Sequence, residues 1–481
     1  MASNPMLEPS SLAPPHRSIR DLPGPRGVPF LGNALQIKTS RIHLQLEAWS
    51  RVYGERYRIS LGPRTFLVTS NQNDISQVMK DRPDGFRRTS RLEMISKGFG
   101  MGGLFSANGE QWKRQRPLIM SAFNPGHVKA YFSAIHTATR RLQQRWKNFS
   151  ESGAAFELEP DLMRYTVDIT AGLAFGTDIN TIESKEEIIQ EHLQDIFRML
   201  QKRLFAPIPY WRWIRLAEDR KLDQDLQSVG VAITGFIAAA RQRMQNNPSL
   251  YEQPSNLLEA MIAARDGNDS KLSESELAGN MLTMLLAGED TTAHTLAWLI
   301  HFLYCSPQVL ERVRQEVNSV LGAEPIATRH EQLSQLDYVD ACIQEAMRLK
   351  PVGPIMATEA NQDTVLAGIS LPKGSLVMLL TRMGCLNEEH FDAPQAFLPE
   401  RWLGGATPAT HRKISIPFGA GPRTCPGRYL ALEEMKMLIS MLLHNFDIDS
   451  VQTTDGDTVE ERLSFTLVPV GLQMRLADRR S

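Results

Sequence analysis

The feature that most constrains this fold is a helical pattern of roughly 30 residues between about Ser273 and Cys305. A helix of that length is about 45 Å long and could cross a whole domain. Ser273 and Glu276 have the spacing of a capping box, which predicts a start at this point. The middle of the pattern reads Ala-Gly-Glu-Asp-Thr-Thr over residues 287–292. Glycine costs about 1 kcal/mol there and threonine is a poor helix former, which indicates stability exchanged for function.

The rest of the chain predicts a mainly α fold with a smaller β-rich portion. Helical patterns fill most of residues 108–305, with an interruption at the FAPIPYWRW stretch of residues 205–213, and return at 310–321, 338–349 and after Cys425 to about residue 445. Strand patterns occur at 57–61, at 65–69 and between residues 351 and 380. We expect residues 1–22 to be a flexible N-terminal segment and residues 23–481 to form a single domain.

Composition excludes several classes of protein. The chain carries 53 basic and 54 acidic side chains, so nothing in its net charge calls for nucleic acid as a partner. Its four cysteines include no CxxC pair and make neither a disulfide framework nor a zinc ribbon, which favours a reducing cytoplasm. Residues 1–21 lack the apolar core of a signal peptide or membrane anchor. We therefore expect a soluble, cytoplasmic protein without a transmembrane anchor.

One cysteine lies in a loop whose chemistry can be read directly. Residues 418–431 read FGAGPRTCPGRYLA, with three glycines and two prolines around Cys425. We expect Cys425 at the start of the following helix, with Pro426 in its first turn. Backbone N–H groups and the positive end of that helix would then stabilise a thiolate. Arg423 offers a cation for an anionic group on the same ligand.

The spacing of this loop resembles the haem-binding signature of cytochromes P450. Phe418, Gly421, Arg423, Cys425 and Gly427 follow the pattern FxxGxRxCxG, which Ala431 completes. The resemblance implies the cytochrome P450 fold and haem b (iron protoporphyrin IX), with Cys425 as the proximal iron ligand. In such enzymes the thiolate pushes electron density toward cleavage of the O–O bond. Taken alone, a cysteine before a helix is more often a buried structural residue.

Two further motifs resemble the family pattern. Glu345 and Arg348 lie three residues apart on one predicted helix, and Arg401 follows in a Pro-Glu-Arg-Trp segment, as in the family's Glu-Arg-Arg cluster. The resemblance implies a buried structural network. Trp112 and Arg116 resemble the family's WxxxR element, whose side chains donate to a haem propionate. Without the resemblance, each motif reads as an ordinary helix face.

The centre of the long helix also resembles the family. Residues 287–292 match the pattern (A/G)GxDT, which places Ala287 beside the haem. The resemblance implies that Asp290 and Thr291 are an acid–alcohol pair that relays protons to bound dioxygen. One departure is Thr358, which stands where family members often carry Arg or His. Propionate neutralisation would therefore rest on Arg116 and Arg423.

By family analogy the substrate is a hydrophobic small molecule, such as a fatty acid, terpenoid, steroid or polyketide. Apolar residues are expected to line its pocket, methionines among them: Leu92, Met94, Ile95, Phe99, Met101, Met284, Ala287, Val352, Ile355, Met356, Phe465 and Leu467. The chain has no flavin or iron–sulfur segment, so NAD(P)H would act only indirectly, through a ferredoxin or flavodoxin-type donor. A basic patch is expected to receive it: Lys113, Arg114, Arg428 and Lys436. We expect a monomer.

Three functions are compatible with these motifs. The first is a soluble, bacterial-type monooxygenase that inserts one oxygen atom from O2 into its substrate. The second keeps the fold but uses peroxide or isomerises hydroperoxides; such members usually lack the acid–alcohol pair, so Asp290 and Thr291 argue against it. The third is a non-catalytic haem or gas-binding protein.

Overall fold

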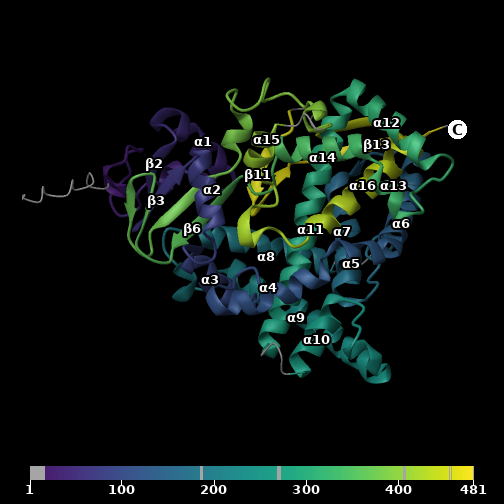
Figure 1. Ribbon diagram of the computed structural model, residues 1–481, viewed down its shortest axis with the longest axis horizontal. Helices are drawn as coiled ribbons and strands as arrows, with labels where there is room; N and C mark the ends of the chain where they lie inside the picture. The colour runs from purple at the N-terminus through teal and green to yellow at the C-terminus, as the bar shows by residue number, and fades with distance from the viewer. Residues whose placement is uncertain are drawn as a thin grey trace, which may run out of the picture.

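The long helix lies at the centre of the molecule. In the computed structural model, which describes residues 17–184, 188–267, 272–404, 408–453, 456 and 458–479, it is α11 (Glu274–Tyr304), and α7 (Leu158–Phe175) packs along it (Figure 1). The Ser273 hydroxyl accepts from the Glu276 N–H at 3.1 Å, and the Glu276 carboxylate accepts from the Ser273 N–H at 2.9 Å. The predicted capping box is therefore present and fixes where the helix begins.

Helices form most of the structure around α11, as the periodicity predicts. Their bounds are α1 Ile42–Tyr53, α2 Gln72–Lys80, α3 Ser90–Gly98, α4 Gly109–Ala122, α5 Pro125–Ala130, α6 Phe132–Ser152, α8 Ile188–Phe205, α9 Ala217–Asn246, α10 Leu257–Asp266, α12 Pro307–Leu321, α13 His330–Ser334, α14 Asp337–Leu349, α15 Ala409–Ile414 and α16 Arg428–Asn445. The predicted interruption at residues 205–213 is the connection between α8 and α9. The mainly α class with a smaller β portion is confirmed.

The β portion is divided into separate sheets, of which the largest lies to one side of the helices (Figure 1). Its largest sheet has the order β2 (Arg56–Leu61), β3 (Arg64–Thr69), β9 (Leu376–Leu380), β6 (Ile355–Ala360) and β4 (Phe86–Arg88). The smaller sheets pair β10 (Phe446–Thr453) with β13 (Leu472–Asp478) and β5 (Phe156–Glu157), β11 (Glu461–Ser464) with β12 (Thr466–Pro469), and β7 (Thr364–Leu366) with β8 (Ile369–Leu371). Strands distant in sequence thus meet beside the helical part.

The start of the chain differs from the expectation in one respect. Residues 1–16 of the segment predicted to be flexible lie outside the described residues. The next residues are folded: β1 (Arg17–Ser18) pairs with β8, and a 3-10 turn follows at Ile19–Asp21. Parallel hydrogen bonding to β8 holds this stretch against the sheet, so the folded part begins before residue 23.

No helix in the described ranges combines the length and the apolar character that crossing a membrane requires.

Candidate active site

A cavity of about 320 Å³ lies between α11 and the loop that carries Cys425. The α4 helix closes another side of it with Trp112 and Arg116, and β6 contributes Met356. We call this space the main cavity. Because α11, α4 and the loop come from distant parts of the chain, only the tertiary fold brings their side chains together.

The cysteine loop is held close to its neighbours. The Cys425 N–H donates to the Phe418 carbonyl at 2.8 Å. Gly421 has a φ of 71°, and a Cβ on it would lie 2.4 Å from the Met79 carbonyl oxygen, so this position requires glycine. The following helix, α16, begins at Arg428 with Gly427 as its N-cap. The prediction that Pro426 lies in its first turn was wrong, because two more residues are needed to complete the loop.

Cys425 is accessible from the main cavity, which it lines, although it lies deep in the protein. Burial raises the pKa of the Cys425 thiol, while the Gly427 N–H and the Arg116 charge act in the opposite direction. The groups expected to stabilise a thiolate are therefore in place. In the protein chain alone, however, their effect on the pKa of Cys425 is smaller than that of burial. A bound metal cation deprotonates a coordinating thiol outright.

Nine of the ten predicted site residues line the main cavity. They are Trp112, Arg116, Ala287, Thr291, Phe418, Arg423, Cys425, Gly427 and Ala431. The tenth, Asp290, faces a second cavity on another side of α11. The predicted acid and alcohol are thus adjacent in sequence but line separate spaces, because consecutive helical residues point about 100° apart.

The centre of α11 shows why its unusual residues are tolerated. The Thr291 hydroxyl donates to the Ala287 carbonyl one turn earlier, at 2.8 Å. Gly288 lies against α7, and a Cβ there would fall 2.2 Å from the Thr170 hydroxyl oxygen. The glycine thus permits close packing of α11 on α7 as well as lining the cavity.

Arginine side chains gather on one side of the main cavity. They are Arg82, Arg88, Arg116 and Arg423, and none forms an ion pair with a carboxylate among the described residues. The Nε atoms of Arg82, Arg88 and Arg423 are buried without a hydrogen-bond partner. Burial lowers the pKa of Arg82 to about 10, and burial with the charges of Arg82 and Arg116 lowers that of Arg423 to about 9. Uncompensated cations with unused N–H groups fit a ligand with two carboxylates, as haem has.

The sequence did not reveal Arg82 and Arg88 as site residues. Arg88 lies in β4 directly opposite Thr358 of β6, and its guanidinium lies 3.8 Å from the centre of the Phe105 ring. Thr358 itself is buried and donates to the Val377 carbonyl at 3.4 Å. A positive charge therefore lies on the adjacent strand, opposite the position at which Thr358 carries none. Only the β4–β6 register shows this, and no spacing in the sequence could have.

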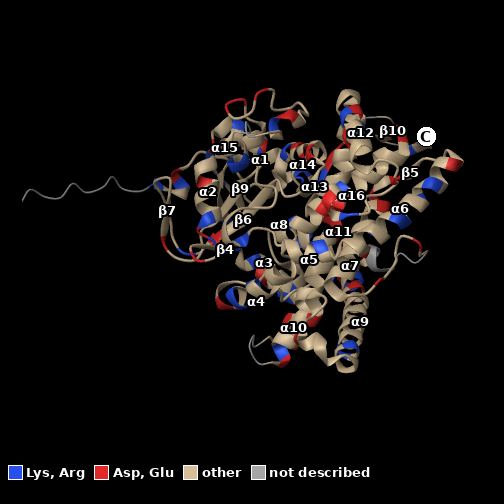
Figure 2. Ribbon diagram, turned by 45° about the vertical axis from the view of Figure 1, so that its right-hand side comes forward, with Lys and Arg blue, Asp and Glu red and all other residues tan. Residues whose placement is uncertain are grey.

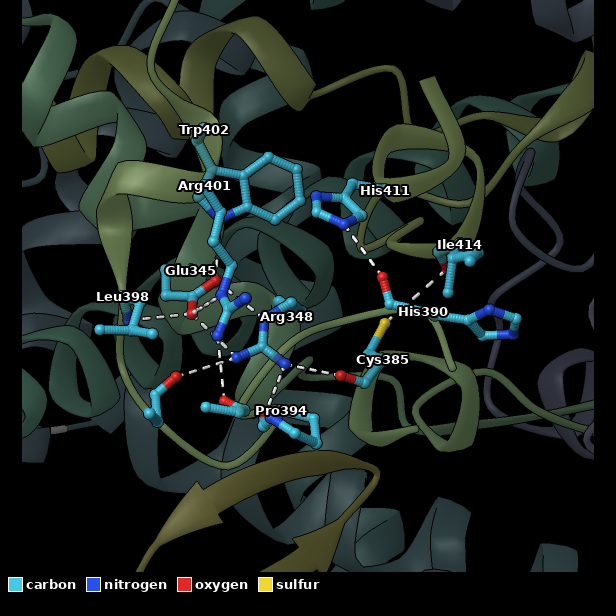
Figure 3. A network of polar contacts seen from close by, with 12 residues as sticks. Glu345, Arg348, Cys385, His390, Pro394, Leu398, Arg401, Trp402, His411 and Ile414 are labelled. Carbon is cyan, nitrogen blue, oxygen red and sulfur yellow. Dashed lines mark hydrogen bonds and ion pairs between the residues drawn. The ribbon is translucent and has the colours of Figure 1, made fainter. Parts of the chain in front are cut away.

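The Glu-Arg-Arg cluster is confirmed as a buried network (Figure 3). Arg348 donates from Nε and Nη2 to the Glu345 carboxylate at 2.8 Å each, and Arg401 Nε donates to it at 3.1 Å. Arg348 Nη1 also donates to the carbonyls of Cys385 and Pro394, at 2.6 and 2.7 Å. These contacts tie α14 to the irregular stretch before the cysteine loop.

Trp402 completes the same network, which sequence reasoning did not foresee. Its indole Nε1 donates to Glu345 Oε2 at 2.8 Å (Figure 3). Glu345 also accepts from the Leu398 N–H at 3.0 Å, so its carboxylate binds two cations and two neutral donors. The only indication of this role in the sequence was that Trp402 directly follows Arg401.

The predicted substrate lining is correct only in part. Met284, Ala287, Val352 and Met356 line the main cavity, together with the unpredicted Leu104, Phe105, Phe123 and Met347. The other eight predicted residues do not: Leu92, Met94, Ile95, Phe99, Met101, Ile355, Phe465 and Leu467. The segment before α4 forms a helix, α3, that directs Leu92 and Ile95 into the core. Phe465 stacks on Phe197 instead. Its ring centre lies 5.9 Å from that of Phe105, which does line the cavity.

The predicted basic patch is mostly neutralised by neighbouring acids. Lys113 pairs with Glu110, Arg114 with Glu276 and Lys436 with Asp340, at 3.2, 2.6 and 3.2 Å; Arg428 alone has no such partner in the described residues. Basic and acidic residues are interspersed over the helices in Figure 2. The expected four-cation surface is therefore not supported.

Residues 22–476 match the family model for Cytochrome P450. The chain belongs to the cytochrome P450 family. It is similar to Protein LUTEIN DEFICIENT 5, chloroplastic, of Arabidopsis thaliana, with 27% identity over 89% of this chain and 74% of that protein. It is also similar to Cytochrome P450 97B2, chloroplastic, of Glycine max (24% identity, covering 88% and 81%) and to Cytochrome P450 3A15 of Cavia porcellus (25%, covering 88% and 85%).

Family membership establishes the general chemistry of this cytochrome P450. It is a haem-thiolate monooxygenase that binds haem b. The three relatives are plant and mammalian proteins, so they give no support to a bacterial type.

Proposed function

We propose that this cytochrome P450 hydroxylates or epoxidises a hydrophobic small molecule, with electrons supplied by a separate protein. The observation that carries this proposal is the main cavity, where Cys425 and Thr291 share one space with apolar side chains. Pockets of this size and character bind drug-sized apolar ligands. A fatty acid, terpenoid, steroid or polyketide-like substrate fits these walls.

The residues around the main cavity fit the haem that the reaction needs. We assign Cys425 as the iron ligand, and Arg82, Arg88, Arg116 and Arg423 as donors to its two carboxylates. Bound haem supplies the oxygen chemistry. The small residues Gly427 and Ala431 leave room for a flat ring beside the cysteine. Asp290 and Thr291 remain our proposed pair for proton delivery, from the two sides of α11 on which they lie.

The substrate is proposed to lie between the haem site and a group of apolar residues that line the same cavity. These are Leu104, Phe105, Met284, Val352 and Met356. Methionine adapts to varied shapes, which suits a pocket that positions a molecule by contact. The name of the Arabidopsis relative refers to lutein, a terpenoid, so terpenoids come first in a screen.

We propose a ferredoxin or flavodoxin-type protein as the electron donor, since reduction by NAD(P)H requires an intermediary here. Arg428 is the member of the expected basic patch that is exposed and has no ion pair among the described residues. The monomeric state and the cytoplasmic location stay predictions, and two of the relatives carry names that place them in chloroplasts.

The decisive experiment is a carbon-monoxide difference spectrum of the reduced protein. The wild type and the control variant Cys305→Ala should both give the red-shifted thiolate band. The control removes an exposed cysteine far from the haem site. Cys425→Ala should not. A mutant at Cys425 that keeps the band, or a wild type without it, would overturn the assignment. A spin-state screen over terpenoids and lipids then identifies the substrate class.

The alternatives differ in their oxidant and in turnover. Turnover with NADPH and a ferredoxin system, but not with peroxide, separates the proposed monooxygenase from a peroxide-driven enzyme or a hydroperoxide isomerase. A non-catalytic haem or gas-binding protein would turn over no substrate, and Thr291→Ala would then change only ligand binding.

A further inference from the structure

A second cavity of about 470 Å³ lies on another side of α11 and is far more polar than the main cavity. Its walls come from α7, α8, α11, β11 and β12. Charged side chains with partial exposure stand at its edge, Arg198 at 53% and Lys202 at 41%. Asp290 and His294 reach it from α11, and they share a face because they lie four residues apart. Solvent can therefore approach the helix that carries Asp290 without entering the main cavity.

A continuous series of polar contacts runs from Asp290 to this cavity. The Thr466 hydroxyl lies 3.4 Å from Asp290 Oδ2, and His294 Nδ1 lies 2.9 Å from the same hydroxyl. His294 Nε2 lies 3.1 Å from Glu159 Oε1. His294 is only 1% exposed, whereas the Glu159 side chain is 29% exposed. The series thus begins at a buried carboxyl group and ends at one that meets solvent.

The surroundings of Asp290 and His294 raise the pKa of both groups. Burial raises the pKa of Asp290 to about 6, with a further increase from Glu159, against the opposing effects of His294 and Thr466. Burial disfavours a charged His294, but Glu159 and Asp290 outweigh it and raise the pKa of the ring, while Arg462 acts against them.

Other charged groups also face this region. Glu289 lies beside Asp290 on α11, and burial followed by the Asp290 charge raises its pKa. Across the cavity, Asp195 pairs with Arg198 at 3.1 Å, and Lys202 pairs with Glu218. Because Asp195, Arg198 and Lys202 are matched in pairs, none of these three displaces Glu159 from His294.

Two features, one at each end of this series, are not explained by a structural role of His294 alone. Asp290 Oδ1 is buried without a hydrogen-bond partner, an arrangement that costs stability and calls for a functional explanation. At the other end, the partly exposed Glu159 carboxylate lines the cavity, and in the described part of the chain its ion-pair partner is His294 itself.

We propose that Glu159, His294 and Thr466 form a proton relay that reloads Asp290 from solvent in the second cavity. The inference rests on the proposed function, in which Asp290 delivers protons across α11. In one transfer, Glu159 gives its proton to His294 Nε2, and the Nδ1 proton passes to the Thr466 oxygen. The Thr466 hydroxyl proton moves to Asp290 Oδ2. One proton leaves Glu159 and one arrives at Asp290, while His294 and Thr466 end neutral.

Exchange of the Asp290 proton tests the relay without substrate turnover. Infrared difference spectra of the ferric holoenzyme after a change from H2O to D2O follow the Asp290 carboxylic acid band, which is identified by its loss in Asp290→Asn. Exchange should slow by about 10-fold or more in Glu159→Gln and His294→Gln, since positioned acid–base groups contribute at least that much. Asp195→Asn changes a carboxylate of the same cavity outside the series and should exchange like the wild type. Equal exchange rates in all variants overturn the relay.

Turnover gives the second measurement. With a surrogate ferredoxin system, kcat should fall by about 10- to 100-fold in Glu159→Gln and His294→Gln, with a larger solvent isotope effect and an unchanged KM. Glu159→Asp should recover part of the rate. Wild-type kcat with its wild-type isotope effect in both variants overturns the relay. A wild type that lacks the thiolate band or any turnover overturns the proposed function instead, and the exchange measurement still decides the relay.

Discussion

At the scale of single residues, the most informative finding is the set of arginines around the main cavity. Arg82 and Arg88 come from the segment before α3, and Arg116 and Arg423 from α4 and the cysteine loop. Isolated buried cations are costly unless a counter-charge satisfies them. In this chain they lie beside the place where Cys425 would hold haem. Because they destabilise the protein without a counter-charge, their presence indicates an anionic ligand at this place.

We predict that Arg88→Met weakens haem binding. Loss of a hydrogen bond to a charged group should reduce the binding free energy by about 1.5–3 kcal/mol. The haem-free protein should be as stable as the wild type or more stable, because repulsion from Arg82 and Arg423 is removed. Haem transfer to an acceptor protein and denaturant unfolding of the haem-free form measure the two effects.

The neighbouring Arg87→Met is the matched control. Arg87 lies on the same strand but forms an ion pair with Glu359 at 2.7 Å. The Arg87→Met variant should be less stable than the wild type with or without haem, and its affinity for haem should be unchanged. Equal haem transfer rates from the two variants would contradict the assignment of Arg88.

At the scale of elements, contacts between α14 and the irregular stretch before the cysteine loop decide how that loop is held. Glu345 and Arg348 are both 0% exposed, so each depends on the other for its charge. The sequence predicted the three charged members. It could not predict the carbonyls of Cys385 and Pro394 that complete the coordination of Arg348, because irregular backbone has no periodicity to read.

We predict that Arg348→Met destabilises the protein by about 3–5 kcal/mol, since it leaves the Glu345 carboxylate buried with too little compensation. Denaturant unfolding of the holoenzyme measures this loss. Lys129→Met removes a pair with Glu331 in which both side chains are more than half exposed, and should cost under about 1 kcal/mol. Similar losses in both variants would show that the network contributes little.

The contact between α11 and α7 gives another prediction. Gly288→Ala should destabilise the protein by about 1–3 kcal/mol, because the new Cβ overlaps Thr170. Thr170→Ala removes the two nearest atoms, so the double variant should recover part of the loss in an unfolding experiment. Gly230→Ala in α9 meets open space and should be neutral or stabilising. Additive losses at 288 and 170 would contradict close packing as the reason for Gly288.

At the scale of the whole molecule, Glu461 of β11 joins α1, the end of α14 and the turn after β9. Its carboxylate accepts from Arg382 at 3.0 Å on each oxygen, from His43 at 3.1 Å and from Lys350. Burial alone would raise its pKa. The hydrogen bonds from His43 and Arg382 outweigh burial and hold the pKa of Glu461 well below its ordinary value.

A carboxyl group with a depressed folded-state pKa stabilises the protein above its unfolded pKa, about 4.3, and loses that effect as the pH falls toward the folded value. We predict that Glu461→Gln lowers the free energy of unfolding at pH 7 by about 1–3 kcal/mol. The difference from the wild type should shrink below about pH 4. Denaturant midpoints from pH 7 to pH 3 measure it, and the exposed Glu311→Gln should show no difference. A gap that widens in acid would refute the sign of this linkage.

The sequence by itself determined the long helix and its cap, the cysteine loop and the charged members of the Glu-Arg-Arg cluster. Nine of the ten site residues that it predicted line the main cavity. Each is local, written in periodicity or fixed spacing over a few turns. Only the tertiary structure decided on which side of α11 Asp290 lies, that Arg88 lies opposite Thr358, and that Phe105, not Phe465, lines the main cavity. These depend on strand register and on helix packing between distant segments, where a shift of one residue turns a side chain to the other face.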